Sequence, residues 1–181
     1  LAAPQLIQPN VEVLSALMRA IHLQKAITCS YVSLSSGGSE RKLVPHSLAN
    51  DGHRWHVRAF DHLHQEFRDF SCSRFEAISL VNDALQEKES REFDHQWNRV
   101  VDLELIPHPS IVYPEAIMMD YGMIDGKRCV QIRAALAGYL LCYWNVDCST
   151  DYSLPPERYP LALNNVAALY GVEKVPVDKS F

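Results

Sequence analysis

The feature that most constrains the fold is a run of short, β-rich segments between Ile27 and Val81, separated by residues that favour turns. The turns are Ser35–Ser39 (Ser-Ser-Gly-Gly-Ser), Asn50–Gly52 (Asn-Asp-Gly) and the polar stretch Asp61–Gln65. Such alternation is typical of successive antiparallel strands. The expected strands are 27–34, 41–48, 54–60, 67–71 and 75–81. Five short strands at this spacing predict a small, strongly bent β-barrel of the SH3 or Sm kind.

A helix is expected before the barrel. Asn10 is a suitable N-cap, and apolar side chains then recur at the spacing of one helical face, which predicts an amphipathic helix over residues 11–22. The apolar positions are Leu14, Leu17, Met18 and Ile21. We expect this stripe to face a core or a dimer partner.

The second half of the chain predicts a separate α/β domain. Residues 83–95 are charged and nearly free of β-branched side chains, which indicates a linker or a short solvated helix. The expected elements after it are a strand around 101–105, a helix over 114–121, a strand over 127–133, a buried helix over 134–144 and a C-terminal helix over 161–170. The fold class is therefore α+β. Its predicted parts are a helix and linker segment (1–26), a barrel (27–82), a linker (83–95) and an α/β extension (96–181).

Composition indicates a globular protein of a reducing compartment. Hydrophobic residues make up 48% of the 181 residues. The longest apolar run, Ala134–Trp144, is well short of the roughly 20 residues that span a bilayer as a helix, so no membrane segment is expected. The five cysteines are scattered without a Cys-x-x-Cys pair, which favours the cytoplasm. The chain also lacks an initiator methionine, so it is expected to be a fragment or a processed product.

Basic residues concentrate in the predicted barrel. The net charge is −5, but the stretch from Arg41 to Arg74 holds six basic and four acidic residues. Within it, arginine and aromatic side chains alternate on two adjacent strands, and we expect Arg58 and Arg68 to share one surface. Arginine forks bind phosphate and aromatic faces stack on bases, so such a surface suits a nucleotide or a short nucleic acid. The alternative is cross-strand pairing of these arginines with Asp61, Glu66 and Asp69.

Signals for catalysis or for metal binding are weak. His62 and His64 lie in a predicted turn without the further ligands that a zinc site requires. The Ser35–Ser39 loop lacks the Gly-Lys-Ser/Thr of a phosphate loop, and no Gly-x-Ser-x-Gly motif occurs. We therefore expect no enzyme activity, no metal and no cofactor; a small hydrolase that uses histidine and serine is the least favoured reading.

Three short motifs in this stretch resemble the signature of the WYL domain, a ligand-sensing module of bacterial transcription regulators. The signature is a Trp-Tyr-Leu strand, an Asp-containing turn, a Phe-Arg-x-Phe strand and a trailing Ser-Arg-hydrophobic triplet. The corresponding residues here are Trp55-His56-Val57, Phe67-Arg68-Asp69-Phe70 and Ser73-Arg74-Phe75. His56 and Val57 depart from the pattern. The sequence around Trp55 is similar to that of repressors associated with anti-phage defence. Residues 94–181 resemble the C-terminal (WCX-like) extension of such regulators.

The resemblance implies a switch that binds a nucleic acid or nucleotide effector. It implies a site lined by Tyr31, Ser33, His46, His56, Arg58, Arg68 and Arg74. It further implies a homodimer, and operator DNA bound only through an N-terminal winged helix-turn-helix that this chain lacks. Alternatives stay open for single residues, since Tyr31 and Ser33 also fit a core edge and a solvent face, and Arg74 also fits a pair with Asp69. The alternative function is a purely structural dimerisation or protein-interaction module.

Overall fold

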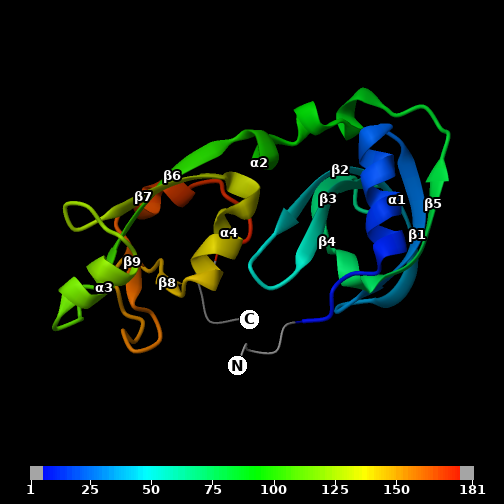
Figure 1. Cartoon of the computed structure of the whole chain (residues 1–181). Coiled ribbons are helices and arrows are strands. Elements are labelled where there is room, and N and C mark those ends of the chain that lie inside the picture. The colour runs from blue at the N-terminus through cyan, green and yellow to red at the C-terminus, as the bar shows by residue number, and fades with distance from the viewer. Residues whose placement is uncertain (1–5, 176–181) are drawn as a thin grey trace. The chain divides into compact units, whose positions relative to one another are not determined.

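The chain folds into two compact units that meet between Asp94 and His95 (Figure 1). The computed structural model describes residues 6–175. Residues 1–5 and 176–181, the outer ends of the first and last predicted parts, lie outside the described residues. Each unit contains its own sheet and its own hydrophobic core.

The first unit begins with α1 (Val11–His22), which confirms the predicted helix. The side chain of Asn10 accepts a hydrogen bond of 2.8 Å from the backbone N–H of Glu12, so an otherwise unpaired donor of the first turn is satisfied. Val13, Leu17 and Ala20 are buried against the sheet. Of the predicted stripe, Leu17 and the partly buried Leu14 and Ile21 therefore belong to this unit's own core, whereas Met18 is exposed.

The five strands predicted for the first unit are present. They are β1 (Ala26–Ser33), β2 (Gly37–Asn50), β3 (Trp55–Asp61), β4 (Glu66–Ser71) and β5 (Phe75–Val81). Their order is β4-β3-β2-β1-β5 and each neighbouring pair is antiparallel. Long β2 is shared between β1 and β3, and irregularities after Ser30 and Pro45 mark where the sheet bends.

The structure does not confirm closure of this sheet into a barrel. Among the described residues β4 and β5 are the two edges, and a 3-10 turn, η1 (Cys72–Arg74), carries the chain from one to the other. At the end of β4 the backbone N–H of Ser71 donates to the Tyr31 hydroxyl at 3.0 Å rather than to a strand. The hydroxyl of Tyr31, a β1 residue, thus satisfies this backbone donor at the end of β4.

Both faces of the first sheet are covered. The inner face packs on α1. The outer face carries Val44 and Phe60, which pack with Phe67, Val81 and Leu85. Residues 82–94, which we call the strap, follow this outer face through two 3-10 turns, η2 (Glu87–Glu89) and η3 (Arg91–Phe93). A linker or solvated helix was expected here, yet Glu89 and Asp94 are buried. Arg58 and His46 bind the carboxylate of Asp94, and Glu89 accepts a bond from the backbone N–H of Gln86 and lies 3.0 Å from His62 Nε2.

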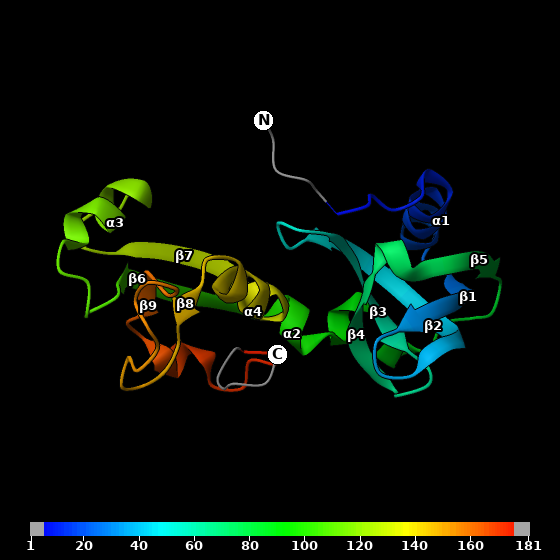
Figure 2. The same ribbon diagram turned by 90° about the horizontal axis from the view of Figure 1, so that it is seen from below.

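The second unit is a four-stranded sheet with α4 packed on it (Figure 2). Its strands are β6 (Val100–Pro107), β7 (Arg128–Arg133), β8 (Val146–Asp147) and β9 (Leu161–Leu163), in the order β7-β6-β9-β8 with β8 and β9 parallel. Its helices are α2 (His95–Asn98), α3 (Pro114–Asp120) and α4 (Ala134–Tyr143), followed by a 3-10 turn, η4 (Val166–Leu169). The predicted helices 114–121 and 134–144 and both predicted strands are confirmed.

The helix expected over residues 161–170 is wrong. Leu161–Leu163 instead form β9, which pairs with β6 on one side and β8 on the other and buries all three side chains. The side chain of Asn165 then bonds the backbone of Asp102 and Glu104. These contacts with distant strands stabilise the extended backbone and outweigh the helical preference of the segment.

We expect Leu17→Ala to lower the free energy of unfolding by about 2–5 kcal/mol, because truncation leaves a cavity beneath α1. Met18→Ala is the matched control, since Leu17 is 0% exposed and Met18 is 60% exposed on the same helix. The control should change stability by no more than about 0.5 kcal/mol. Urea denaturation followed by circular dichroism measures both, and equal losses would mean that α1 does not contribute to the core as described.

Candidate functional site

The strand register separates the two arginines that were expected to share a surface. Arg58 lies opposite Asp69, and Arg68 lies opposite Ala59. Residues directly opposite each other in an antiparallel pair point to the same face. Because Arg58 and Ala59 are neighbours on β3, Arg58 points to the outer face and Arg68 to the inner face. The expectation of one common surface is therefore wrong.

On the outer face, Arg58 and His46 converge on the carboxylate of Asp94. Arg58 donates twice, from Nε to Oδ2 at 2.7 Å and from Nη2 to Oδ1 at 3.0 Å. His46 Nε2 lies 3.0 Å from Asp94 Oδ2, and its Nδ1 lies 2.9 Å from Ser47 Oγ. Arg58 Nη1 also contacts Asp69 Oδ1 at 3.3 Å. We call this group the Asp94 network (His46, Ser47, Arg58, Asp69 and Asp94).

The Asp94 network is buried. The Arg58 side chain is 3% exposed and that of Asp94 1%. Burial by itself lowers the pKa of Arg58, but the hydrogen bond to Asp94 and the charges of Asp69 and Asp94 outweigh burial and raise that pKa. The guanidinium therefore stays charged. Two of the predicted site residues, His46 and Arg58, are indeed brought together, but by an acidic residue of the strap that sequence reasoning missed.

On the inner face, a second polar group lies at the ends of β2, β3 and β4. We call it the inner basic cluster (Ser39, Arg41, Asp61, His64 and Arg68). Asp61 Oδ2 lies 3.2 Å from Arg41 Nη1 and 2.6 Å from His64 Nδ1. Arg68 Nη1 lies 2.9 Å from the same His64 nitrogen. Arg41 Nε donates to Ser39 Oγ at 3.0 Å.

The inner basic cluster is partly open to solvent. Arg41 and Asp61 are buried, whereas the side chains of His64 and Arg68 are 41% and 42% exposed. One ring nitrogen cannot donate to Asp61 and also accept from Arg68, so one of these two contacts is not a hydrogen bond. The Arg68 guanidinium, whose contact with exposed Glu66 is 3.5 Å long, retains donors for an anion. Sequence reasoning found Arg68 but missed Arg41 and His64.

The other predicted site residues have local roles. Tyr31 is buried, with its ring edge-on to Phe70 and Phe75. Ser33 Oγ accepts hydrogen bonds from two backbone N–H groups of the following turn. His56 Nε2 lies 2.7 Å from Asp51 Oδ2, and Arg74 is partly exposed in η1. Tyr31 and Ser33 thus occupy positions that suit their structural alternatives.

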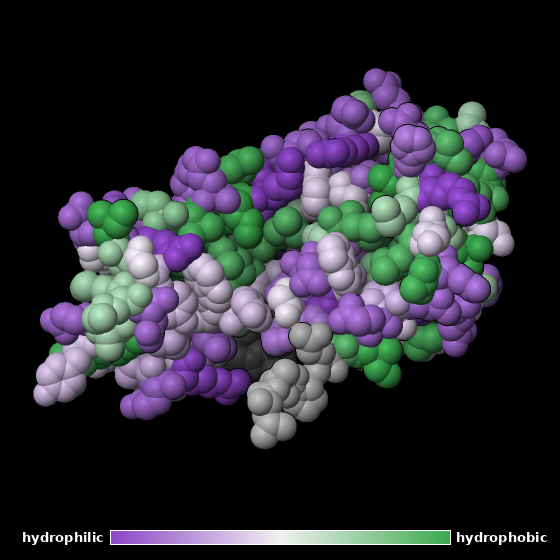
Figure 3. All heavy atoms as spheres, viewed as in Figure 1, coloured by the Kyte–Doolittle hydropathy of each residue, from purple (hydrophilic) through white to green (hydrophobic). Residues whose placement is uncertain are grey.

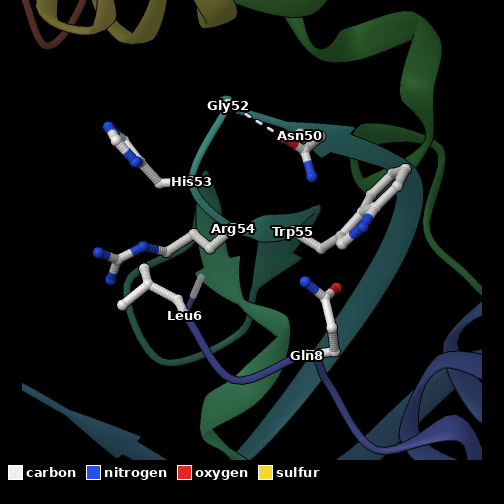
Figure 4. Close-up of a pocket in the computed structure, with 7 residues that line it drawn as sticks. All are labelled: Leu6, Gln8, Asn50, Gly52, His53, Arg54 and Trp55. Atoms are coloured by element: carbon white, nitrogen blue, oxygen red, sulfur yellow. Dashed lines mark hydrogen bonds between the residues drawn. The ribbon is translucent and has the colours of Figure 1, made fainter. Parts of the chain in front are cut away.

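A hollow of about 550 Å³ lies at the tip of the β2–β3 hairpin (Figure 4). Figure 4 shows His53 and Arg54 on one side of it and Trp55 and Asn50 on the other, with the segment that carries Leu6 and Gln8 nearby. The Asn50 side chain accepts a bond from the backbone N–H of Gly52, which shapes the turn. None of the seven predicted site residues lines this hollow.

His108, Asp147 and Ser149 have the composition of a catalytic triad, but their hydrogen bonds are made within the protein. His108 Nε2 lies 3.2 Å from Asp147 Oδ2, but Ser149 Oγ donates to Asp147 rather than to His108. His108 Nδ1 accepts from the backbone N–H of Ser110. These bonds fix the loop that follows β8. Within residues 6–175 no three His, Cys, Asp or Glu side chains are grouped as a metal site, and no helix there is long and apolar enough to span a membrane.

Comparison with known families identifies both units. Residues 12–80 match the family model of the WYL domain. This chain contains a WYL domain. Residues 100–169 match a second model, described as BrxR transcriptional regulator, C-terminal dimerization domain. The resemblance to the WYL signature is thereby confirmed, and the WYL match falls in the first unit and the dimerization match in the second.

Curated relatives of this WYL-domain chain are named DNA-binding transcriptional repressor CapW. The Escherichia coli protein is 38% identical over 177 residues, which cover 96% of this chain and 58% of the relative. The Pseudomonas aeruginosa protein is 36% identical over 159 residues, covering 86% of this chain and 52% of the relative. The chain thus spans a little over half the length of these relatives. Among solved structures, the proteasome accessory factor B/C (PafBC) of Arthrobacter aurescens aligns with a TM-score of 0.42 and 19% identity, over 94% of this chain and 29% of that one.

We expect the cysteines of the WYL unit to resist alkylation in the native protein. Burial raises the pKa of Cys29 and Cys72 to about 12, so both thiols are protonated at pH 8 and shielded. Exposed Cys129 should react with iodoacetamide first, and all five cysteines should react after denaturation. Peptide mass spectrometry gives the order. Labelling of Cys29 or Cys72 as fast as Cys129 would contradict their burial.

Proposed function

We propose that this chain is the effector-sensing and dimerising part of a transcriptional repressor. The observation that carries the proposal is the succession of a WYL domain and a dimerization domain in one chain, matched over 96% of its length by a relative named as a DNA-binding repressor. Operator recognition would come from a part of the repressor outside this chain. In support, α1 carries one arginine, Arg19, and α4 carries no basic residue, whereas helices that read DNA need several.

The proposed effector carries phosphate, as a nucleotide or a single-stranded nucleic acid does. The inner basic cluster supports this, because Arg41 pairs with the buried carboxylate of Asp61, whereas Arg68 contacts only His64 and, at 3.5 Å, the exposed Glu66. Exposed Arg68 and His64 are the groups that such a ligand can reach. Guanidinium forks bind phosphate oxygens strongly. An effector that binds the DNA-competent and DNA-incompetent states unequally would shift operator occupancy.

We expect Arg68→Ala to weaken binding of a short single-stranded oligonucleotide about 5- to 150-fold, because about 1–3 kcal/mol of charge-assisted contact is lost. The melting temperature should change little, since the pair with Glu66 is exposed. Arg19→Ala, at the exposed end of α1, is the matched control and should bind like the parent. Fluorescence anisotropy measures affinity. Unchanged binding by Arg68→Ala would place the effector site elsewhere.

We also propose that two copies associate through the second unit. Several large hydrophobic or aromatic side chains on and beside α3 are exposed. Figure 3 shows green and pale-green spheres among hydrophilic ones in the region of α3. The exposed side chains are Val112, Tyr113, Met119 and Ile124, between 75% and 82% exposed. Exposed apolar groups of this kind mark interaction surfaces, and the unit matches a dimerization domain. Of the α1 stripe that was the sequence's candidate for a core or a dimer contact, Leu17 is buried and Leu14 and Ile21 pack on the first unit's core, so only Met18 is exposed. A structural dimerisation module without an effector remains the second candidate function.

We expect light scattering to give twice the 20.6 kDa chain mass at micromolar concentration. The double variant Met119→Glu, Ile124→Glu should shift the mass to that of the monomer, because it introduces charges into an apolar interface. Leu34→Glu, at a position 88% exposed in the first unit, is the control and should remain dimeric. A dimeric double variant would exclude the α3 surface, and a monomeric parent would exclude dimerisation by this chain.

A further inference from the structure

We infer that His46, Ser47 and Arg58 form an anion-binding site that the chain fills with its own Asp94. A phosphate-bearing ligand would compete with Asp94 for this site and release the strap from the sheet. The WYL resemblance already implies His46 and Arg58 as effector contacts; the inference adds that Asp94 occupies this part of the site, on the face of the sheet opposite Arg68, and that a ligand must displace the strap. It rests on the proposed function only in the chemical class of the ligand.

The geometry around Asp94 is that of a receptor for an oxyanion. Arg58 presents two N–H groups side by side, one to each carboxylate oxygen, at 2.7 and 3.0 Å. Such a fork also matches two oxygens of a phosphate. When Nδ1 of His46 accepts from the Ser47 hydroxyl, its Nε2 carries the proton and donates to Asp94. Three donors on β2 and β3 thus converge on one bound anion.

The receptor groups and the bound carboxylate come from different segments. His46, Ser47 and Arg58 belong to the sheet, and Arg58 is further held by Asp69 of β4 at 3.3 Å. Asp94 belongs to the strap and is the last residue of the first unit. The receptor can therefore keep its shape when Asp94 leaves. Asp94 acts as a tethered competitor, and a tethered group competes at an effective concentration that reaches millimolar values.

The remaining strap contacts are unequal in strength. The ion pair of Lys42 with Asp83 is exposed on both sides, and such pairs contribute only about 0–1 kcal/mol. Leu85 packs on the outer face, and Glu89 lies 3.0 Å from His62. Loss of the Asp94 contact frees the end of the strap that directly precedes His95, the first residue of the second unit. Ligand binding at Arg58 would thus loosen the connection between the WYL unit and the dimerization unit.

The first test removes the tethered carboxylate. Asp94→Asn keeps the side-chain shape but removes the charge, and Asp83→Asn on the same strap is the matched control. When Asp94 occupies the site in at least nine of ten parent molecules, the apparent affinity of the parent is reduced at least about tenfold. We therefore expect inorganic phosphate, pyrophosphate and a mononucleotide to bind Asp94→Asn at least about tenfold more tightly than the parent. The control should bind like the parent. Adding Arg58→Lys to Asp94→Asn should abolish the gain, because lysine cannot donate the fork. Isothermal titration calorimetry measures each affinity.

The second test uses the unmodified protein, so it does not depend on a variant that folds. Hydrogen exchange of residues 82–94 should accelerate when pyrophosphate or the mononucleotide is added. Unchanged exchange at saturating ligand, or equal affinities of Asp94→Asn and the parent, would overturn the inference. If ligand binding is lost in Arg68→Ala while the Asp94→Asn and exchange results are negative, the proposed effector site stands and the Asp94 site falls. If Arg68→Ala binds ligand like the parent while Asp94→Asn binds it more tightly and exchange of the strap accelerates, the Asp94 site stands and the proposed site at Arg68 falls.

Discussion

The position of the strap on the first sheet depends on the ion pair between Arg58 and Asp94, which is buried between them. Removing two charges from water costs several kcal/mol each, and the cost is offset only when geometry is good and every hydrogen-bonding group is used. Here the fork of Arg58, the imidazole of His46 and the second carboxylate, Asp69, meet that condition. Loss of Arg58 would leave two buried carboxylates without their shared guanidinium, whereas loss of Asp94 leaves Arg58 paired with Asp69. Leu85 of the strap also packs against the apolar cluster that contains Val44 and Phe60.

A buried pair of this kind is weak evidence for stability alone, because well-packed apolar residues often stabilise as much. What it provides is a specific position of the strap on the sheet. The WYL unit therefore has two basic groups with different access, one open on the inner face around Arg68 and one covered on the outer face around Arg58. A ligand can act on a repressor only if it binds its states unequally, and a strap that either covers or exposes Arg58 offers two such states.

Much of this fold could be predicted from residue pattern, and the failures have particular causes. The strands of the first unit follow from turn residues and β-rich segments, and α1 follows from the N-cap Asn10 and its apolar period. The error over Leu161–Leu163 arose because three apolar residues suit a helix or a strand equally, and only pairing with β6 and β8 decides between them. The strap was predicted to be solvated because the sequence shows Glu89 and Asp94 only as charged residues, and their burial depends on contacts with distant residues.

The candidate site shows the same division. The sequence by itself determined that a WYL signature is present and that arginines and aromatics interleave on β3 and β4, and it predicted Arg58, Arg68 and His46 as candidate ligand contacts. Only the tertiary structure decided which face each arginine occupies, since a shift of one residue in register moves a side chain to the opposite face of a sheet. It also decided that Asp94, 36 residues from Arg58 along the chain, binds its guanidinium. Contacts between residues so far apart depend on how the whole chain packs, and no local pattern records them.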